Sequence, residues 1–421
     1  MRLAVAGGGY VGLSTATGFA RQGHVVDLVE IDAGRAQTLA LGRLPFDEPS
    51  LARAFQDERR AGSINIHHGY ESLSGNVDFA FICTSTPLTA QGFLDTAQVF
   101  QAAEMLTASL SGALRLVVRS TVNPGTTDRL QDMLGSPEGV QVLVNPEFLR
   151  EGSALYDFEA PARVVVGGAD HDAVDALGRL YDFAHVRTLR TNAVTAELIK
   201  LTSNAALAVR VSMANEIARI AAHTEADLDM VLEGVGSDPR IGQDYLNPGL
   251  GFGCSCLPKD LEALRAAAQS AGISLPVFDG ASLTNDEVIE ILADRIAGAR
   301  PGAAQRIAVV GVGFKPGSDS LRNSQPVRLV RTLLARGASL TVFDPVAEQN
   351  ARREFGERVA YAQDIYRLME SADTIVVVDK ALFRGALNGH LPSAEGKVII
   401  DAVGRQFCLT HSDKEMAYGR R

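Results

Sequence analysis

The chain has 421 residues, 46% of them hydrophobic, and a formal net charge of −10. A single core stops growing near roughly 250–300 residues, so two or three domains are expected. The acidic balance disfavours nucleic-acid binding, no apolar run approaches the roughly 20 residues that span a bilayer, and the cysteines form no C-x-x-C pair. We therefore expect a cytoplasmic protein without a structural metal, a disulfide framework, or a nucleic-acid or membrane partner.

The first part of the chain alternates between strand and helix patterns. An apolar run at 2–7 meets a glycine cluster, a helical pattern continues to about residue 22, and a β-rich run at 24–30 completes a βαβ unit. Further buried-strand candidates are 77–83, 114–120, 140–145 and 163–167. Such alternation is typical of a parallel, doubly wound sheet, and we assign it to a first domain at 1–190.

A different composition begins near residue 192. Residues 192–222 are rich in Ala, Leu and Glu and contain neither Pro nor Gly, which predicts one long helix. A helix of this kind is a natural spacer and a natural dimer surface. Helical patterns continue at 260–271 and 276–298, so we expect a central helical dimerisation domain at 191–298.

The last part of the chain repeats the opening pattern. A plausible linker at 299–304 leads to a strand at 306–310, a helix near 326–336, and strands at 339–344, 372–379 and 396–401. This predicts a second, degenerate Rossmann-like domain at 299–421. The expected fold class is α/β, with two Rossmann-like doubly wound domains joined by a long central helix and a helical middle domain.

The first glycine cluster has the spacing of a dinucleotide-binding turn. Gly7, Gly9 and Gly12 lie between a strand and a helix, where they allow the tight turn, the approach of a pyrophosphate and close helix packing. The helix N-terminus adds free amides for the phosphates. In the second domain Gly311 and Gly313 are followed by Pro316 where the third glycine should lie. A second dinucleotide is therefore not expected there, and a different nucleotide is more plausible.

An acidic residue ends the second strand, where the adenosine ribose should be bound. Glu30 has the expected position, and Asp32 is the competing candidate. An acid at this point repels a 2′-phosphate, so NAD is favoured over NADP. Arg35 could neutralise the phosphates.

The segment GLGFGCSCLPKDLEAL places Cys256 after a glycine-rich run. Lys259 and the expected helix start at Asp260 are surroundings that favour a thiolate. Taken alone, a cysteine is more often a small buried apolar residue than a nucleophile.

Six separated blocks together resemble the UDP-glucose/GDP-mannose dehydrogenase family over nearly the whole chain. They are GGGYVGL at 7–13, VVRSTVNPGTT at 117–127, NPEFLREGSA at 145–154, AELIKLTSNAALAVRVSMANEI at 196–217, GFGCSCLPKD at 251–260 and GFKPGSDSLRNS at 313–324. The resemblance implies an enzyme that oxidises a nucleotide sugar twice and reduces two NAD. It implies UDP-glucose as substrate, UDP-glucuronate as product, and Cys256 as the nucleophile of a thiohemiacetal and then a thioester.

The resemblance also implies roles for individual residues. Lys200 and Asn204, one helical turn apart, would stabilise the alkoxide. Asp260 would position or activate water, assisted by Thr121 and Glu151, and Glu147 would support the site geometry or share the acid–base chemistry. The residues expected at the cofactor are Gly7, Gly9, Tyr10, Val11, Gly12, Glu30, Arg35, Thr86, Thr121, Glu151, Lys259 and Arg322. Those expected at the substrate are Glu147, Phe148, Leu149, Arg150, Lys200, Asn204, Arg240, Tyr245, Gly253 and Lys315. Arg240 resembles the residue that reaches across a homodimer.

One position departs from the family pattern. Cys254 stands where the family usually has glycine, and its side chain could constrain the loop or be tolerated because cysteine is small. A disulfide between Cys254 and Cys256 would be strained and would silence the nucleophile, so we do not expect it in a reducing cell, but we do expect sensitivity to oxidation. Other substrates remain open, namely GDP-mannose or a UDP-N-acetylhexosamine. So do two other classes of protein, a non-catalytic nucleotide-sugar binder and a one-step dehydrogenase that would need no thiol.

Overall fold

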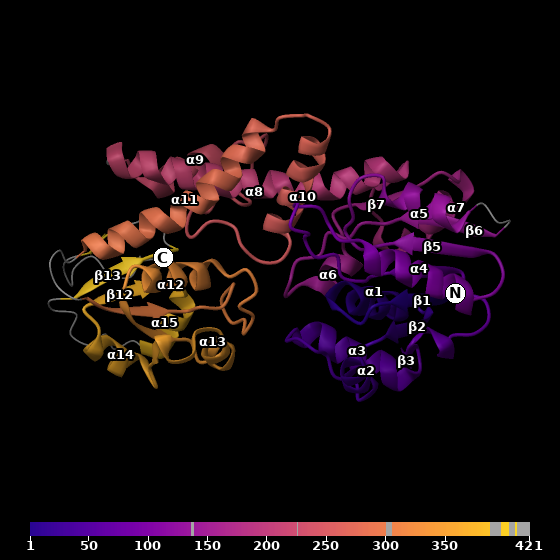
Figure 1. The fold of residues 1–421 in the computed structure, drawn as a ribbon, viewed down its shortest axis with the longest axis horizontal. Coiled ribbons are helices and arrows are strands. Elements are labelled where there is room, and N and C mark those ends of the chain that lie inside the picture. Colours follow the sequence, from indigo (N-terminus) through magenta and orange to yellow (C-terminus); the bar gives the residue numbers. More distant parts are fainter. Residues whose placement is uncertain (136–138, 225, 300–304, 388–396, 404–408, 411–421) are drawn as a thin grey trace. The chain divides into compact units, whose positions relative to one another are not determined.

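Alternating buried strands and amphipathic helices build the computed structural model, which describes residues 1–135, 139–224, 226–299, 305–387, 397–403 and 409–410. The chain divides into two compact units, one of residues 1–203 and 262–273 and the other of residues 204–261 and 274–421. The division falls inside the helices α8 (Ala193–Thr224) and α10 (Leu257–Ser270). Figure 1 labels the elements of both units.

The first unit is built on a sheet in which eight described strands have the order β3-β2-β1-β4-β5-β6-β7-β8. The strands are β1 (Arg2–Ala6), β2 (Val25–Glu30), β3 (Ile64–His68), β4 (Phe79–Ile82), β5 (Leu114–Val118), β6 (Val140–Val144), β7 (Val164–Gly168) and β8 (Thr188–Thr191). The order through β6 is that of a dinucleotide-binding sheet, with its switch point between β1 and β4. All described pairings are parallel except β6 with β7, which are antiparallel. The expectation of a parallel sheet is therefore wrong at β7.

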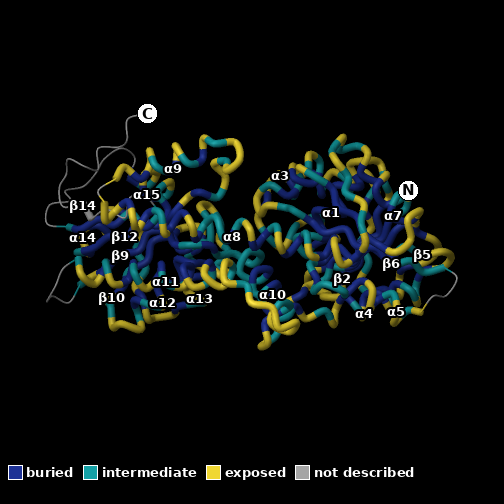
Figure 2. Tube along the Cα trace, turned by 90° about the horizontal axis from the view of Figure 1, so that it is seen from above, coloured by how far each residue is buried: buried dark blue, intermediate teal, exposed yellow. Residues whose placement is uncertain are grey.

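Helices cover both faces of this sheet because alternate strand residues are apolar on opposite sides. One core joins residues such as Val5 and Phe81 to α1, α3 and α7, and the other joins Ala4 and Ile82 to α4 and the start of α8. The helices are α1 (Tyr10–Arg21), α2 (Ala33–Ala40), α3 (Pro49–Ala61), α4 (Ala97–Ser109), α5 (Thr126–Leu134), α6 (Ala154–Glu159) and α7 (His171–Arg179). The doubly wound prediction is confirmed, and the central strands β1 and β4 are almost wholly buried (Figure 2).

The second unit contains the remainder of α8, α9 (Leu228–Gly236), α11 (Pro276–Gly298) and a second sheet. Its described strands have the order β11-β10-β9-β12-β13-β14, with β13 and β14 antiparallel. The strands are β9 (Arg306–Val310), β10 (Ser339–Phe343), β11 (Ala360–Tyr361), β12 (Thr374–Val377), β13 (Val398–Asp401) and β14 (Leu409–Thr410), and the helices are α12 (Gln325–Ala335), α13 (Glu348–Phe355), α14 (Ile365–Ser371) and α15 (Lys380–Leu387). Val309 contacts the core that contains α11 and α12, whereas Val310 contacts the core that contains α14 and α15. The second Rossmann-like sheet is confirmed.

The long helix is also confirmed, because α8 covers the segment that the composition indicated. Of the expected linker at 299–304, all but Ala299 lies outside the described residues. In the part of the chain that the structure describes, no helix is both long and apolar enough to cross a membrane.

Candidate active site

The glycine turn between β1 and α1 has two glycines that the fold itself requires. Gly7 has φ +109°, and a Cβ there would lie 2.7 Å from the carbonyl oxygen of Cys83. A Cβ on Gly12 would collide with the carbonyl oxygen of Gly7. Gly9 differs, because it has an ordinary φ of −87° and a Cβ added there would meet no atom within 4 Å. Open space therefore adjoins the first amides of α1, which is where a pyrophosphate would need to approach.

The two acids that competed for the ribose position have different surroundings. Glu30 is 3% exposed, and its carboxylate accepts hydrogen bonds from the amides of Gly8 at 3.0 Å and Asp32 at 2.8 Å. Asp32 instead caps α2, accepting from the amide of Arg35 at 2.7 Å. The Arg35 guanidinium also lies 3.1 Å from Glu30 Oε2. Glu30 is therefore the acid that faces the glycine turn.

Tyr10 links the glycine turn to the loop that follows β6. Its hydroxyl donates to the carbonyl of Arg150 at 3.0 Å and accepts from the amide of Gly152 at 3.1 Å. Burial raises the pKa of this hydroxyl well above its usual range, and the nearby Glu48 carboxylate adds to the rise. Val11 packs against the first core. The hydroxyl of Tyr10 thus fixes loop geometry.

Hydrogen bonds connect the loops after β4 and β5 at the same edge of the sheet. The buried Thr86 hydroxyl donates to the carbonyl of Thr121 at 2.7 Å. Ser120 donates to the carbonyl of Thr84 at 2.7 Å. Both predicted threonines therefore lie at the carboxyl ends of strands beside the switch point, where ligands of such sheets bind.

A buried ion pair joins the loop after β6 to α8. Lys200 Nζ lies 2.9 Å from Glu147 Oε1, and both side chains are less than a tenth exposed. Glu147 also accepts from the amide of Leu149 at 2.7 Å. Burial acts most strongly and would raise the pKa of Glu147, but Lys200, the Leu149 amide and Arg119 together hold that pKa below its usual range. Glu147 is consequently a carboxylate at neutral pH.

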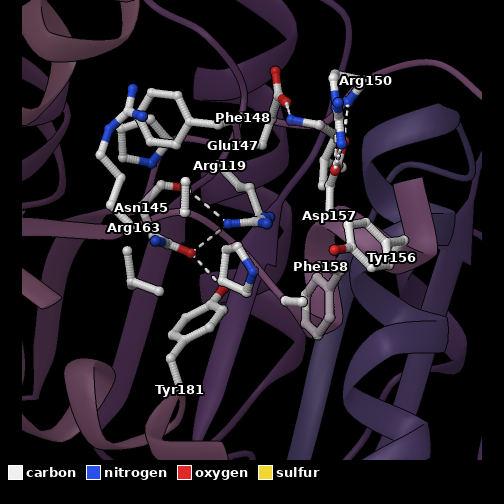
Figure 3. A pocket seen from close by; sticks show the side chains of 16 residues that line it. Arg119, Asn145, Glu147, Phe148, Arg150, Tyr156, Asp157, Phe158, Arg163 and Tyr181 are labelled. Carbon is white, nitrogen blue, oxygen red and sulfur yellow. Dashed lines mark hydrogen bonds and ion pairs between the residues drawn. The ribbon is translucent and has the colours of Figure 1, made fainter. Parts of the chain in front are cut away.

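The same loop borders a cavity of about 320 Å³ in the first unit (Figure 3). Arg119 Nη1 donates to Asn145 Oδ1, which also accepts from the Tyr181 hydroxyl at 2.5 Å. Arg163 lies 4.0 Å from the centre of the Phe148 ring. Arg119 and Arg163 were not among the predicted site residues, although Arg119 lies within the VVRSTVNPGTT block.

Arg150 and Glu151 occupy the exposed end of this loop. The Arg150 guanidinium pairs with Asp157 at 2.6 Å, as Figure 3 shows, and its backbone amide donates to Asp157 at 2.7 Å. Glu151 is exposed and close enough to Tyr10 to raise that hydroxyl's pKa, as a minor contribution beside burial and Glu48. The pairing with Asp157 fixes the direction of the loop.

In the second unit a buried carboxylate follows the predicted nucleophile. Asp260 is 1% exposed; Asn204 Nδ2 donates to its Oδ2 at 2.6 Å, and Lys259 Nζ lies 2.9 Å from its Oδ1. The Asp260 amide donates to the carbonyl of Cys256 at 2.9 Å. Cys256 thus directly precedes the first turn of α10, where the helix dipole stabilises a negative charge.

The loop at 249–256, here called the Cys loop, is held from several sides. Asn215 of α8 accepts from the amide of Gly249 at 2.9 Å, Asn285 of α11 accepts from the amide of Phe252 at 2.6 Å, and Gln325 of α12 donates to the Phe252 carbonyl at 2.7 Å. A Cβ on Gly253 would lie 2.6 Å from the Asn323 carbonyl oxygen. Gly253, which was predicted as a substrate-binding residue, therefore has no room for a side chain, because the Asn323 backbone lies too close.

The other predicted residues of the second unit lie on loops, where their side chains are exposed or half-buried. Arg240 is 87% exposed and forms a bidentate pair with Asp238. Tyr245 has a φ of +61°. Lys315 Nζ lies 5.4 Å from the centre of the Phe314 ring, and Arg322 is exposed on the same loop. Arg240, Lys315 and Arg322 are cations that could bind a diphosphate.

Three domain models of one protein family match consecutive parts of the chain. Residues 1–185 match the NAD binding domain of the UDP-glucose/GDP-mannose dehydrogenase family, residues 194–287 its central domain, and residues 308–404 its UDP binding domain. The chain belongs to this family. It is accordingly an NAD-dependent nucleotide-sugar dehydrogenase, and the open face of Gly9 and the position of Glu30 fit that cofactor.

Individual relatives extend the match along the chain. The UDP-glucose 6-dehydrogenase TuaD of Bacillus subtilis is 34% identical, with 90% of this chain and 83% of the relative covered. The UDP-glucose 6-dehydrogenase of Pseudomonas aeruginosa is 36% identical, with 90% and 87% covered. The solved structure of a UDP-glucose dehydrogenase from Pyrobaculum islandicum is 32% identical, covers 96% of this chain and 94% of its own, and has a TM-score of 0.88.

Proposed function

We propose that this family member oxidises the primary alcohol of UDP-glucose twice and releases UDP-glucuronate, with Cys256 as the covalent nucleophile. The observation that carries the proposal is the position of Cys256, directly before α10 and followed within one turn by the buried Asp260. A thiol at a helix N-terminus is favoured as a thiolate, and a thiolate attacks carbonyl carbon. A nucleotide-sugar binder or a one-step dehydrogenase has no need of this arrangement.

The chemistry divides between the thiol and its neighbours. The turn at Gly7, Gly9 and Gly12 would hold NAD, which would supply the hydride acceptor for both oxidations. The Cys256 thiolate forms a C–S bond to the aldehyde carbon, and the carbonyl electron pair moves to oxygen. Lys200 and Asn204 stabilise that oxyanion by positive charge and by an amide donor. Loss of the second hydride leaves a thioester.

Hydrolysis requires a base and an ordered water. Asp260 is the proposed base, assisted by Thr121 and Glu151, and Asn204 holds its carboxylate through the 2.6 Å hydrogen bond. Water adds to the thioester carbon, the C–S bond breaks, and the thiolate is restored. Glu147, paired with Lys200, supports the geometry of the site.

The substrate preference is proposed from the charged loops and from similarity. The loop at 147–150, the Cys loop, Lys315 and Arg322 supply groups suited to a nucleotide diphosphate. The relatives named above are UDP-glucose 6-dehydrogenases, which supports UDP-glucose. GDP-mannose is the second candidate, since the family includes enzymes for that substrate.

We also propose a cytoplasmic homodimer formed through the central domain at 191–298, between an NAD domain at 1–190 and a UDP-sugar domain at 299–421. Large apolar side chains are exposed on α8, namely Val194, Leu198, Met213 and Ile220. Such exposure is typical of an interface. The exposed Arg240 would then reach the partner's substrate.

The experiment compares NADH formation with UDP-glucose, GDP-mannose and UDP-N-acetylglucosamine for the wild type and Cys256→Ala. We expect two NADH for each UDP-glucose consumed, little turnover of the other sugars, and a variant that binds UDP-glucose but forms no carboxylate. One NADH per sugar, or an unaffected variant, would contradict the covalent mechanism. Faster turnover of GDP-mannose would contradict the substrate assignment.

A further inference from the structure

Cys254 occupies a backbone conformation that suits glycine better than cysteine. Its φ is +68°, in the left-handed region, and its amide donates to the carbonyl of Asn323 at 3.1 Å. Side chains other than glycine pay conformational free energy there. The residue thus gives the Cys loop a second thiol at the expense of local strain. A strained residue retained in a loop beside a proposed nucleophile suggests a chemical use for its side chain.

The two thiols of the Cys loop are neighbours in space. The Cys256 side chain is the largest cause that lowers the pKa of Cys254, to about 5, despite the opposing effect of burial. Ser255 Oγ lies 3.9 Å from Cys254 Sγ and 3.6 Å from Cys256 Sγ. Both cysteines are partly exposed, so a small solute can reach them.

Cys83 provides the contrast within the described residues. It is buried against the glycine turn, and burial raises its pKa to about 12. A buried, protonated thiol reacts slowly with oxidants, whereas an accessible thiolate reacts readily. The Cys loop is therefore the place where thiol oxidation is expected.

We propose that Cys254 and Cys256 form a redox pair that reacts with hydroperoxides and closes a reversible Cys254–Cys256 disulfide. The thiolate sulfur of the pair attacks one oxygen of the hydroperoxide, so that an S–O bond forms, the O–O bond breaks, and the departing oxygen takes the proton of the second thiol. The second sulfur, now a thiolate, attacks the sulfenic sulfur; the S–S bond forms, the S–O bond breaks, and hydroxide leaves. The pair loses two electrons, and the hydroperoxide is reduced to an alcohol and hydroxide.

The pair would protect the enzyme as well as inhibit it. The disulfide removes the nucleophile, and a dithiol restores it by exchange. Without a neighbouring thiol, the sulfenic acid would be oxidised further to sulfinic and sulfonic acids, which dithiols do not reverse. The loss and recovery of activity rest on the proposed role of Cys256; formation of the disulfide does not.

The test treats the wild type, Cys254→Gly and Cys254→Ser with hydrogen peroxide and without nucleotides. All three carry Cys408→Ser, which removes the fourth cysteine of the sequence so that it cannot exchange with the pair. Glycine suits the left-handed backbone and serine retains a side chain, so the two variants separate backbone strain from loss of the thiol. Each sample is divided for an activity assay before and after dithiothreitol and for non-reducing peptide mapping. Trypsin releases both cysteines on one peptide, residues 241–259.

We expect the wild-type peptide to lose the mass of two hydrogens and to resist alkylation until it is reduced. The wild-type enzyme should regain its activity with dithiothreitol. Both variants should carry sulfinic or sulfonic acid at Cys256 and recover less than about a tenth of their own starting activity. A wild-type peptide without the disulfide, or variants that recover as fully as the wild type, would overturn the proposal. A disulfide that forms while activity is unchanged would support the redox pair and overturn the nucleophilic role of Cys256.

Discussion

Lys200 and Glu147 form an ion pair at 2.9 Å with both side chains almost fully buried. The pair connects α8 to the loop after β6, so the side chain proposed as an oxyanion stabiliser is held by a carboxylate from another element. Desolvation of two charges is costly, and a pair of this kind is retained only when each partner compensates the other. The consequences for stability and for pH dependence can be measured separately.

Removing one partner should destabilise the protein more than removing both. Lys200→Met leaves a buried carboxylate without its cation, which costs about 3–5 kcal/mol. Lys200→Met combined with Glu147→Gln should recover much of that loss. Urea unfolding measures the stability of the single and the double variant. Arg219→Met is the control, because the Arg219–Glu287 pair is about half exposed. Loss of that pair should cost less than about 1 kcal/mol. Equal losses for the single and double variants would contradict this.

The same pair predicts how acid affects stability. The pKa of Glu147 is lower in the folded protein than its usual value, so its contribution is complete above the unfolded-state pKa of about 4.3 and is lost as the pH falls through the lower folded-state value. The free energy of unfolding should therefore decline more steeply with acid in the wild type than in the double variant. Denaturant titrations at a series of pH values test this, and parallel curves would argue against it.

Substituting alanine for Gly12 and for Gly9 should have different effects on stability and on NAD binding. Gly12→Ala brings a Cβ against the Gly7 carbonyl and should lower the melting temperature. Gly9→Ala has free space and an ordinary φ, so it should fold normally and weaken NAD binding, because the added methyl group occupies the space of the pyrophosphate. Thermal melting and calorimetric NAD titration separate the two effects. Unchanged NAD affinity in Gly9→Ala would place the cofactor elsewhere.

Glu30 and Asp32 offer a matched pair at the adenosine end. Glu30→Gln should weaken NAD binding, since it removes the charge that favours the ribose hydroxyls. Asp32→Ala should leave NAD affinity nearly unchanged and cost about 1 kcal/mol of stability, because it removes the cap of α2. NAD titration and urea unfolding of both variants measure these effects. The opposite pattern would make Asp32 the ribose acid.

Most buried strands were predictable from sequence because each is a clear apolar run, and the long helix was predictable because its segment is rich in Ala, Leu and Glu and lacks Pro and Gly. The run predicted at 306–310 and the strand Arg306–Val310 coincide. The polar strand β3, with the sequence INIHH, was missed because it lacks such a pattern. The antiparallel direction of β7 was also missed, since periodicity records which residues are buried and not which way a strand runs.

The sequence yields the candidate site as a list of residues, whose roles stay predictions, but it does not yield their contacts. The glycine spacing and the segment around Cys256 identify residues directly. The sequence alone could not rank Glu30 and Asp32, and the cap that Asp32 forms on α2 is a contact that favours Glu30 as the ribose acid. Arg119 and Arg163 were missed because an arginine alone is expected on the surface, and their partners Asn145 and Phe148 become neighbours only through folding.

The covalent step is tested most directly by trapping the thioester. Asp260→Asn removes the proposed base, so hydrolysis should slow while the two oxidations continue. After incubation with UDP-glucose and NAD, mass spectrometry of the peptide at 241–259 should show a UDP-glucuronosyl adduct on Cys256, released by hydroxylamine. NADH formation by this variant without any adduct, or an adduct on Cys254 instead, would contradict the assignment of Cys256 as the nucleophile.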